Sequence, residues 1–444
     1  MNKKNNDITN AENKTRIIRV AILAEQPLFW QTCALRFFPS ILDNYTWHKD
    51  DKTYTMRTTF IYDKDIRKGE LKKSNYDLLL IPGGGVGDGH SITKGFTFLP
   101  HIKKWKKQIQ EFIKAGGGCI GFCGGASLIT NLSTGENRKP TTFVERQYNK
   151  SSLGISCITS YYKHLALPLF YPFQRAHPEN IGTTAYVFSF YPTETKDGRF
   201  IHTGGVPIDF KLNKKHPVFN DHHKDTERIR WWGGQALIVP DKPDREIHIL
   251  AWYPPKELHE QDSTRIHAWV YTGGLHGLIR AFFKSLSYLK KERLSLSNLF
   301  MCTYFFAGNW VITNRVIESA LAGRPAITAE IYPNENKGRI VLCTAHPEYM
   351  VWWGGRIEEH RNKKFICLAD GLYRWTDIEP LSQSLDDEIT HTWWIVRRLI
   401  AWVAKVPDEH LPPIEKQILS DEIKKTISKN IIWNRTILNV MENI

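Results

Sequence analysis

The stretch Gly116-Gly-Gly-Cys-Ile-Gly-Phe-Cys-Gly-Gly-Ala-Ser-Leu128 predicts a short buried strand, a sharp turn and the start of a helix. Residues 118–121 are small and apolar enough for a buried strand, and residues 126–132 can form a helix. Between them, Cys123 lies in the pattern G-x-C-x-G, the cysteine form of the nucleophile elbow that joins a strand to a helix. The pattern therefore predicts a reactive cysteine at the end of a strand.

Cys123 has two interpretations from this pattern alone. In an elbow, the nucleophile adopts a sparsely populated backbone conformation, and glycines at positions 121 and 125 remove side chains that would collide. The dipole of a helix that starts just after the cysteine favours the thiolate, which is the reactive form. The alternative is a small buried hydrophobic residue beside glycines that end a strand.

A second stretch favours the elbow interpretation. Gly338-Arg-Ile-Val-Leu-Cys-Thr-Ala-His-Pro-Glu-Tyr349 predicts a strand that ends directly before His346 and Glu348. A thiolate nucleophile needs a base, and the base needs an acceptor that orients it. Residues i and i+2 of an extended chain project to the same side, so these two residues can supply both. The two stretches together predict a Cys-His-Glu catalytic triad.

In these segments the chain resembles the class I glutamine amidotransferase-like superfamily, and within it the biotin-protein ligase N-terminal domain group. The matching segments are Leu78-Leu-Leu-Ile-Pro-Gly-Gly-Gly85, Gly121-Phe-Cys-Gly-Gly-Ala126, His216-Pro-Val-Phe219, Trp232-Gly-Gly-Gln235 and Gly338 to Tyr349. The resemblance implies the triad Cys123, His346 and Glu348. It also implies an oxyanion hole made by the backbone N–H of Gly124 and of one glycine between Gly83 and Gly85, so Gly84 and Gly85 are candidates.

One position departs from the family pattern. Members that use glutamine often carry Gln four residues after the nucleophile, where this chain has Ser127. This difference weakens the expectation that glutamine is the substrate, and it leaves the cysteine chemistry unchanged. The chain has no Gly-Arg-Gly-like biotin-adenylate loop, so we do not predict biotin ligation.

The composition is that of an ordinary globular protein. The chain has 444 residues, a hydrophobic content of 41% and a net charge of +14. Its lysines are scattered rather than interleaved with aromatic residues, so we expect a solvated basic surface and no nucleic-acid or membrane partner. Seven cysteines without a C-x-x-C pattern fit a reducing compartment, and no signal peptide is recognisable. We therefore expect a cytoplasmic protein.

Strand and helix patterns alternate along the chain and predict an α/β fold. Predicted strands cover residues 17–24, 55–62, 76–81, 118–121, 184–191, 206–212, 229–239, 247–253, 325–331 and 338–344, and predicted helices cover residues 30–42, 66–72, 100–115, 281–289, 309–321 and 384–405. This alternation favours a doubly wound, mostly parallel sheet, and the family resemblance makes it flavodoxin-like.

The predicted organisation is one α/β domain over residues 16–405. Residues 1–15 are expected to be a disordered tail, and residues 406–444 a helical extension at the C-terminus. Insertions are predicted near residues 133–180 and, with helical structure, near residues 256–321. They account for the long separation of Cys123 from His346, and we expect a lid, a protein-partner surface or additional core there.

His222 and His223 invite a metal interpretation that the sequence does not support. No carboxylate or cysteine lies near them at a recurring ligand spacing, and adjacent exposed histidines are common. Pro82 and the glycines after it resemble a phosphate loop, but no G-K-[ST] follows. The prediction is therefore no metal and no cofactor.

The sequence leaves three functions open. The leading one is a cysteine-dependent hydrolase or amidase-like enzyme acting on an amide or related carbonyl of a small molecule. The second is a non-catalytic binding or regulatory module on the same fold, which the long insertions and Ser127 favour. The third is a glutaminase subunit that donates ammonia to a separate synthase.

Overall fold

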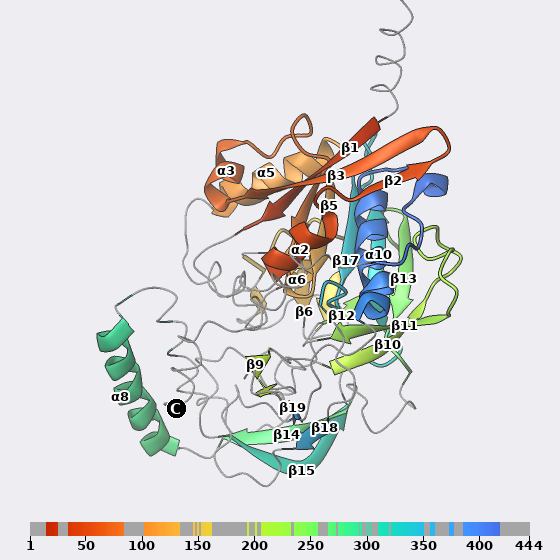
Figure 1. Ribbon diagram of the computed structural model, residues 1–444. Coiled ribbons are helices and arrows are strands. Elements are labelled where there is room, and N and C mark those ends of the chain that lie inside the picture. Colours follow the sequence, from red (N-terminus) through yellow and green to blue (C-terminus); the bar gives the residue numbers. More distant parts are fainter. Residues whose placement is uncertain are drawn as a thin grey trace, which may run out of the picture.

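The computed structural model of the chain (Figure 1) has at its centre one mixed sheet of ten strands. The structure describes residues 15–24, 34–83, 102–133, 145–146, 149–150, 152–161, 193–194, 200–201, 206–231, 235–255, 265–271, 274–292, 294, 299, 302, 310–318, 321–349, 356–359, 373–376 and 385–417. The strand order is β11-β10-β13-β16-β17-β5-β4-β1-β3-β2. The strands are β1 (Thr15–Leu23), β2 (Thr46–Lys49), β3 (Lys52–Ile61), β4 (Leu78–Ile81), β5 (Gly118–Phe122), β10 (Val206–Leu212), β11 (Thr226–Trp231), β13 (Ile247–Trp252), β16 (Pro325–Ile331) and β17 (Arg339–Cys343).

The middle of this sheet is parallel and its two ends are antiparallel. Strands β17, β5, β4, β1 and β3 pair in parallel, in that order. Antiparallel strands extend the sheet from β17 through β16 to β11, and β2 adds an antiparallel edge on the other side. All residues of β4 and β5 are buried, as expected for central parallel strands that are covered on both faces. The α/β class predicted from the sequence is confirmed, and the sheet is mixed.

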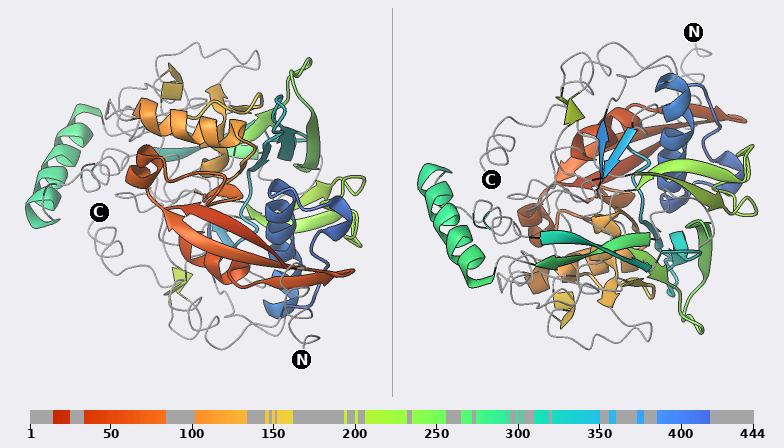
Figure 2. Two further views of the ribbon diagram at one scale, coloured as in Figure 1. Left: turned by 90° about the horizontal axis from the view of Figure 1, so that it is seen from above. Right: turned by 90° about the horizontal axis from the view of Figure 1, so that it is seen from below.

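Helices cover both faces of the sheet (Figures 1 and 2). Alternate residues of β1 belong to different cores: Ile18 and Val20 to one, Ala21 and Leu23 to the other. Helices α2 (Ala34–Leu42) and α10 (Leu385–Val403) pack in the first core. Helices α3 (Asp63–Lys68), α5 (Ile102–Lys114) and α6 (Gly124–Ile129) pack in the second.

Helix α5 shows how the pattern specifies its own packing. Its apolar residues recur at helical spacing and all are buried: Ile102, Trp105, Ile109, Phe112 and Ile113. Its lysines occupy the other face. Burying such a stripe stabilises the fold by roughly 1.5–3 kcal/mol for each large apolar side chain.

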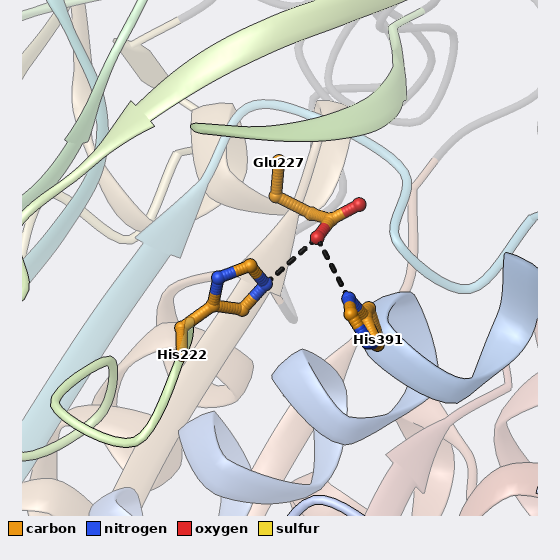
Figure 3. Close-up of side chains that lie close together, drawn as sticks. All are labelled: His222, Glu227 and His391. Carbon is orange, nitrogen blue, oxygen red and sulfur yellow. Dashed lines mark hydrogen bonds and ion pairs between the residues drawn. The ribbon is translucent and has the colours of Figure 1, made fainter. Parts of the chain in front are cut away.

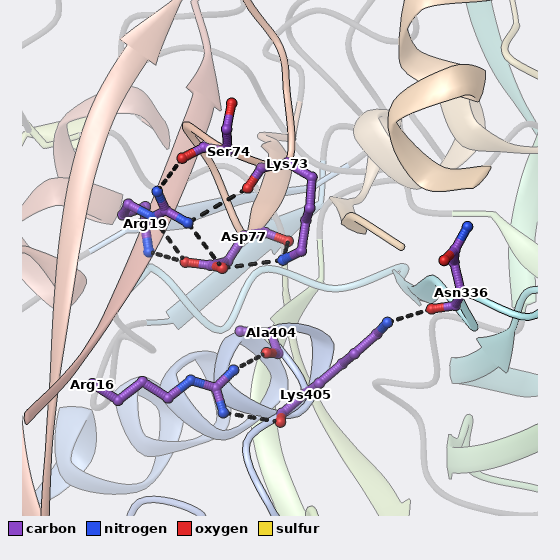
Figure 4. A network of polar contacts seen from close by, with 8 residues as sticks. All are labelled: Arg16, Arg19, Lys73, Ser74, Asp77, Asn336, Ala404 and Lys405. Carbon is purple, nitrogen blue, oxygen red and sulfur yellow. Dashed lines mark hydrogen bonds and ion pairs between the residues drawn. The ribbon is translucent and has the colours of Figure 1, made fainter. Parts of the chain in front are cut away.

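The first strand is also tied to the C-terminal helix by polar contacts (Figure 4). The Arg16 guanidinium donates to the carbonyls of Lys405 at 3.1 Å and of Ala404 at 2.5 Å. Lys405 Nζ in turn donates to the carbonyl of Asn336, just before β17. Although burial opposes ionisation of Asp77, hydrogen bonds from Arg19 lower the pKa of its carboxyl group. These contacts hold β1, β17 and the end of α10 in one unit.

Smaller elements lie outside the main sheet. One small sheet contains β6 (Asn131–Ser133), β7 (Thr159–Tyr161) and β12 (Ala236–Ile238). Three strand pairs are β8 (Thr193–Glu194) with β9 (Phe200–Ile201), β14 (Arg265–Tyr271) with β15 (Trp310–Glu318), and β18 (Arg356–Glu359) with β19 (Tyr373–Thr376). Two further helices are α8 (Gly274–Glu292) and the short 3-10 helix η6 (Asp408–His410). No helix of the described residues is both long and apolar enough to cross a membrane.

Several parts of the sequence prediction were wrong. The strand predicted over residues 229–239 is divided between β11, which ends at Trp231, and β12, which belongs to another sheet. Residues 309–321 were predicted as a helix, but Trp310–Glu318 is strand β15, since its Val, Ile and Thr residues favour extended backbone. The insertion is therefore not purely helical: α8 lies between two paired strands. The prediction also missed β2, which forms a hairpin with β3.

Several other predictions concern residues outside the described ones. They are the disordered tail up to residue 14, the strand at residues 184–191, and the part of the C-terminal helical extension after residue 417. The predicted domain boundaries stay predictions.

Candidate active site

Cys123 lies at the sharp turn between β5 and α6. Its φ is 45° and its ψ is −114°, a conformation that costs a residue with a side chain on the order of 1–3 kcal/mol. Hydrogen bonds on both sides hold it there: its N–H donates to the Cys343 carbonyl at 2.7 Å, and its carbonyl accepts from the Ala126 N–H at 3.0 Å. The strained turn is the backbone geometry predicted for a nucleophile elbow.

The two glycines of the pattern are required by the packing. A Cβ on Gly121 would lie 2.5 Å from the backbone of Gly125, and a Cβ on Gly125 would lie 2.2 Å from the Ile81 carbonyl oxygen. These distances are far below any normal contact, so the glycines let β4, β5 and α6 approach one another. Helix α6 begins directly after Cys123, two residues earlier than predicted, and ends at Ile129 rather than residue 132.

His346 and Glu348 follow strand β17, the neighbour of β5. His346 Nδ1 and Glu348 Oε1 are 2.8 Å apart, and both side chains are buried. The backbone N–H of His346 donates to the Arg230 carbonyl at 2.8 Å, and its carbonyl accepts from Tyr349 at 3.1 Å. The residues therefore meet in a turn rather than in the extended chain that the sequence argument assumed.

Gly83 shows how close Cys123 and His346 lie. A Cβ added to Gly83 would lie 2.5 Å from His346 Cε1 and 3.2 Å from the Cβ of Cys123. The imidazole carbon and the cysteine Cβ are therefore at most about 5.7 Å apart, the sum of these two distances. Only a residue without a side chain fits between them.

The charges around the His346 imidazole raise its pKa. Burial opposes the charged ring, but the Cys123 thiolate and the Glu348 carboxylate outweigh it and raise the pKa of His346 to about 10. Both the charge of the Cys123 sulfur and a hydrogen-bond interaction with it contribute to this shift. The arrangement therefore favours the protonated form of the His346 imidazole.

A network of buried hydrogen bonds holds the backbone of the Cys123 turn. Gln235 Nε2 donates to the Cys123 carbonyl at 3.2 Å, and the Gln235 carbonyl accepts from the Tyr253 hydroxyl at 2.9 Å. The same hydroxyl lies 2.6 Å from Thr344 Oγ1 and accepts from Trp231 Nε1 at 3.2 Å. The sequence analysis assigned Gln235 no role. Its side-chain amide and its backbone carbonyl together link the elbow to Tyr253, directly after β13, and through Tyr253 to Thr344.

Tyr349 packs against one face of the His346 imidazole. Its ring stacks on that of His346 with 4.9 Å between centroids, and the Arg230 guanidinium lies 5.7 Å from the centre of the tyrosine ring. The His346 ring is therefore contacted at its Nδ1 edge by Glu348 and on one face by Tyr349.

The structure brings together some predicted site residues and does not describe others. Cys123, His346 and Glu348 converge beside Gly83, and Gly124 is the buried first residue of α6. Gly84 and Gly85 lie outside the described residues, as do Trp232 and the two glycines after it. Ser127 is fully buried on α6. The catalytic and oxyanion roles of these residues stay predictions.

Comparison with known proteins gives structural similarities of low identity. No protein-family model matches the chain. A putative ThuA-like protein from Bacteroides uniformis is 11% identical, with a TM-score of 0.30 over 74% of this chain and 81% of that one. A cytoplasmic protein from Salmonella typhimurium is 10% identical, with a TM-score of 0.26 over 73% of this chain and 86% of that one.

Proposed function

We propose that this protein is a cysteine-dependent hydrolase of the amidase type on a class I glutamine amidotransferase-like fold. The observation that carries the proposal is the meeting of a strained cysteine after β5 with a buried histidine–glutamate pair after the adjacent β17. In α/β sheets, ligands bind at the carboxyl ends of the strands, where these residues lie. The parallel strand order β3-β1-β4-β5-β17 is the one found in flavodoxin-like folds, which supports the fold assignment.

In the proposed reaction, the Cys123 thiolate attacks the carbonyl carbon of an amide. The new sulfur–carbon bond gives a tetrahedral oxyanion, which then collapses to a thioester as the carbon–nitrogen bond breaks. His346 donates its proton to the leaving amine. Its raised pKa supports this step because the proton already resides on the ring at neutral pH.

Water completes the cycle. His346, neutral after giving up its proton, takes one from a water molecule that attacks the thioester carbon. The carboxylic acid leaves and the thiolate is restored. Glu348 holds the ring through Nδ1 and stabilises its positive charge in both half-reactions, as the acidic member of a triad does.

The oxyanion needs donors that point at it before it forms. We assign this role to the backbone N–H of Gly124 and of a glycine in the segment that leaves β4. Each such donor contributes about 10²–10³ in rate in enzymes of this kind.

Incubation of the full-length protein with a panel of small primary and secondary amides, including glutamine, tests the proposal. Released acid is measured by mass spectrometry, with C123S as the matched control. We expect turnover of at least one amide, a thioester adduct on Cys123, and neither in C123S. Turnover that persists in C123S, or no adduct with any amide or electrophilic amide analogue, would contradict the proposal.

One observation favours the alternative of a binding module without turnover: Cys123 is only 7% exposed. A module of this kind would bind an amide ligand reversibly and equally well with serine at position 123. Binding without an adduct would favour it. The glutaminase alternative predicts ammonia release from glutamine that depends on a copurified synthase.

A further inference from the structure

A second group of titratable side chains lies away from Cys123, where the antiparallel end of the sheet meets α10 (Figure 3). His222 comes from the loop between β10 and β11, Glu227 from β11, and His391 from α10. Glu227 Oε2 lies 2.7 Å from His222 Nε2 and 3.1 Å from His391 Nδ1. One carboxylate oxygen therefore faces two imidazole nitrogens that come from distant parts of the chain.

We propose that His222, Glu227 and His391 form a binding site for a divalent transition-metal ion of the zinc type. Imidazole nitrogen and carboxylate oxygen are the ligands that this ion takes. The three candidate atoms all lie within 4.8 Å of one another. Ligands of a tetrahedral zinc ion, at bonds of about 2.1 Å, are about 3.4 Å apart, so Glu227 would have to move about 0.7 Å from the His222 nitrogen, now at 2.7 Å, and about 0.3 Å from the His391 nitrogen, now at 3.1 Å.

The surroundings of His222 fit a metal-bound imidazole. Its side chain is fully buried, and its Nδ1 lies 3.0 Å from the Lys224 carbonyl oxygen and 3.1 Å from the Lys224 backbone nitrogen. These backbone contacts hold the ring with its Nε2 toward Glu227. Outer-shell contacts of this kind orient a ligating histidine, and binding of the ion releases a proton from Nε2 where one is present.

A water molecule can supply a fourth ligand, because the His391 side chain is 20% exposed. The His223 ring stacks on that of His222, with 5.2 Å between centroids, but His223 is not one of the residues whose ligand atoms lie within 4.8 Å of one another.

The position in the fold indicates what the ion would do. Arg398, seven residues after His391 on α10, already binds the same loop: its Nη2 donates to Asn220 Oδ1 at 2.7 Å and also to the Pro217 carbonyl. A metal at His391 would fasten the other end of this loop, and the start of β11, to the helix. At the end of β11, the carbonyl of Arg230 receives the N–H of His346. The ion would therefore stabilise the strand that positions His346.

Metal binding to the untagged full-length chain tests the proposal. The protein is stripped with a chelator and titrated with Zn²⁺ against a chromogenic competitor. The d–d absorption of Co²⁺ in the same site reports its coordination. We expect one equivalent with micromolar or tighter affinity, a tetrahedral Co²⁺ spectrum and a higher melting temperature with Zn²⁺. Both H391A and E227Q are expected to weaken binding at least about tenfold.

H248A is the matched control. His248 Nε2 lies 2.9 Å from Glu246 Oε1, so it forms a similar pair, but His248 and Glu246 are not part of a three-ligand group within the described residues. We expect H248A to bind Zn²⁺ like the wild type. Circular dichroism and melting without metal show that each variant is folded. The proposal fails if the wild type takes up no zinc at micromolar concentrations, or if folded H391A and E227Q bind it as tightly as H248A does. The measurement requires no enzymatic activity, so its outcome is independent of the amidase proposal.

Discussion

The molecule contains two histidine–carboxylate groups whose charges are arranged in opposite ways. Beside Cys123, one imidazole lies between two anionic groups, and the pKa of His346 is raised to about 10. Where β11 meets helix α10, the Glu227 carboxylate lies between the imidazoles of His222 and His391, and the pKa of Glu227 is lowered to about 2. The first group holds a proton in a buried place, and the second holds a negative charge that attracts cations. The two proposals thus assign proton transfer to one arrangement of these residue types and metal binding to the other.

The largest expected effect is the loss of the nucleophile. In C123S, covalent adduct formation and amide turnover should fall at least about a thousandfold, because a serine hydroxyl is far less acidic than a thiol. Intact-protein mass spectrometry after incubation with substrate measures the adduct. Metal binding at His222 should not change. A parallel loss at both groups would show that the substitution disturbs the fold instead.

Removal of the charged imidazole is expected to be the next largest effect. In H346Q the hydrogen bond to Glu348 can persist, but the proton donor for the leaving amine is lost. We expect turnover to fall about 10²–10⁴-fold. Steady-state kinetics with a fixed amide measures kcat and KM separately. A fall confined to KM would contradict the assignment of His346 as acid and base.

Gly83 tests whether the distance between the sulfur and the ring matters. In G83A the new Cβ would lie 2.5 Å from His346 Cε1 and would push the imidazole away from Cys123. We expect about a tenfold to hundredfold loss of kcat. The control is G323A, because no atom lies within 4 Å of a Cβ there and its φ of 67° makes the substitution strained without touching the site. G323A should lose stability and keep kcat.

The two groups should respond to pH in opposite directions. The folded pKa of Glu227 lies below its ordinary value of 4.5, so its contribution to stability is present above about pH 4.5 and is lost as the pH falls toward 2. The folded pKa of His346 lies above its ordinary 6.5, so its contribution is present below that pH and is lost as the pH rises through about 10. Urea unfolding of the metal-free protein at several pH values measures both.

Variants separate the two contributions. E227Q should lose about 1–3 kcal/mol of unfolding free energy at pH 6 and much less near pH 3. H346Q should flatten the alkaline fall in stability and leave the acid side unchanged. Equal effects of E227Q at both pH values would contradict the assigned charge of Glu227.

The sequence predicted the first group because its residues carry local signals. Glycines at fixed positions around Cys123 mark a turn that only glycine permits, and His346 and Glu348 are two residues apart at the end of an apolar strand. The central strands were equally clear, because β4 and β5 are short, apolar and bounded by turns.

The second group carries no such signal. Glu227 and His391 are 164 residues apart and meet only because α10 packs against the antiparallel end of the sheet. His222 and His223 were visible in the sequence, but the carboxylate and the third imidazole come from tertiary packing. The same limit explains β15, where β-branched residues at a spacing that also fits a helix form a strand by pairing with β14. The role of Gln235 was likewise not predictable, because the residue that it contacts, Cys123, lies far from it in the sequence.

The rate of alkylation of Cys123 by iodoacetamide, followed by peptide mass spectrometry between pH 5 and pH 9, tests the central claim most directly. Cys157 is the internal control, because burial and Glu330 raise the pKa of its thiol to about 12. We predict that Cys123 in the wild type is alkylated much faster than Cys157 over this range, and that H346Q slows the alkylation of Cys123 at least about tenfold. A wild-type Cys123 that reacts no faster than Cys157, or at a rate that does not change in H346Q, would contradict the account.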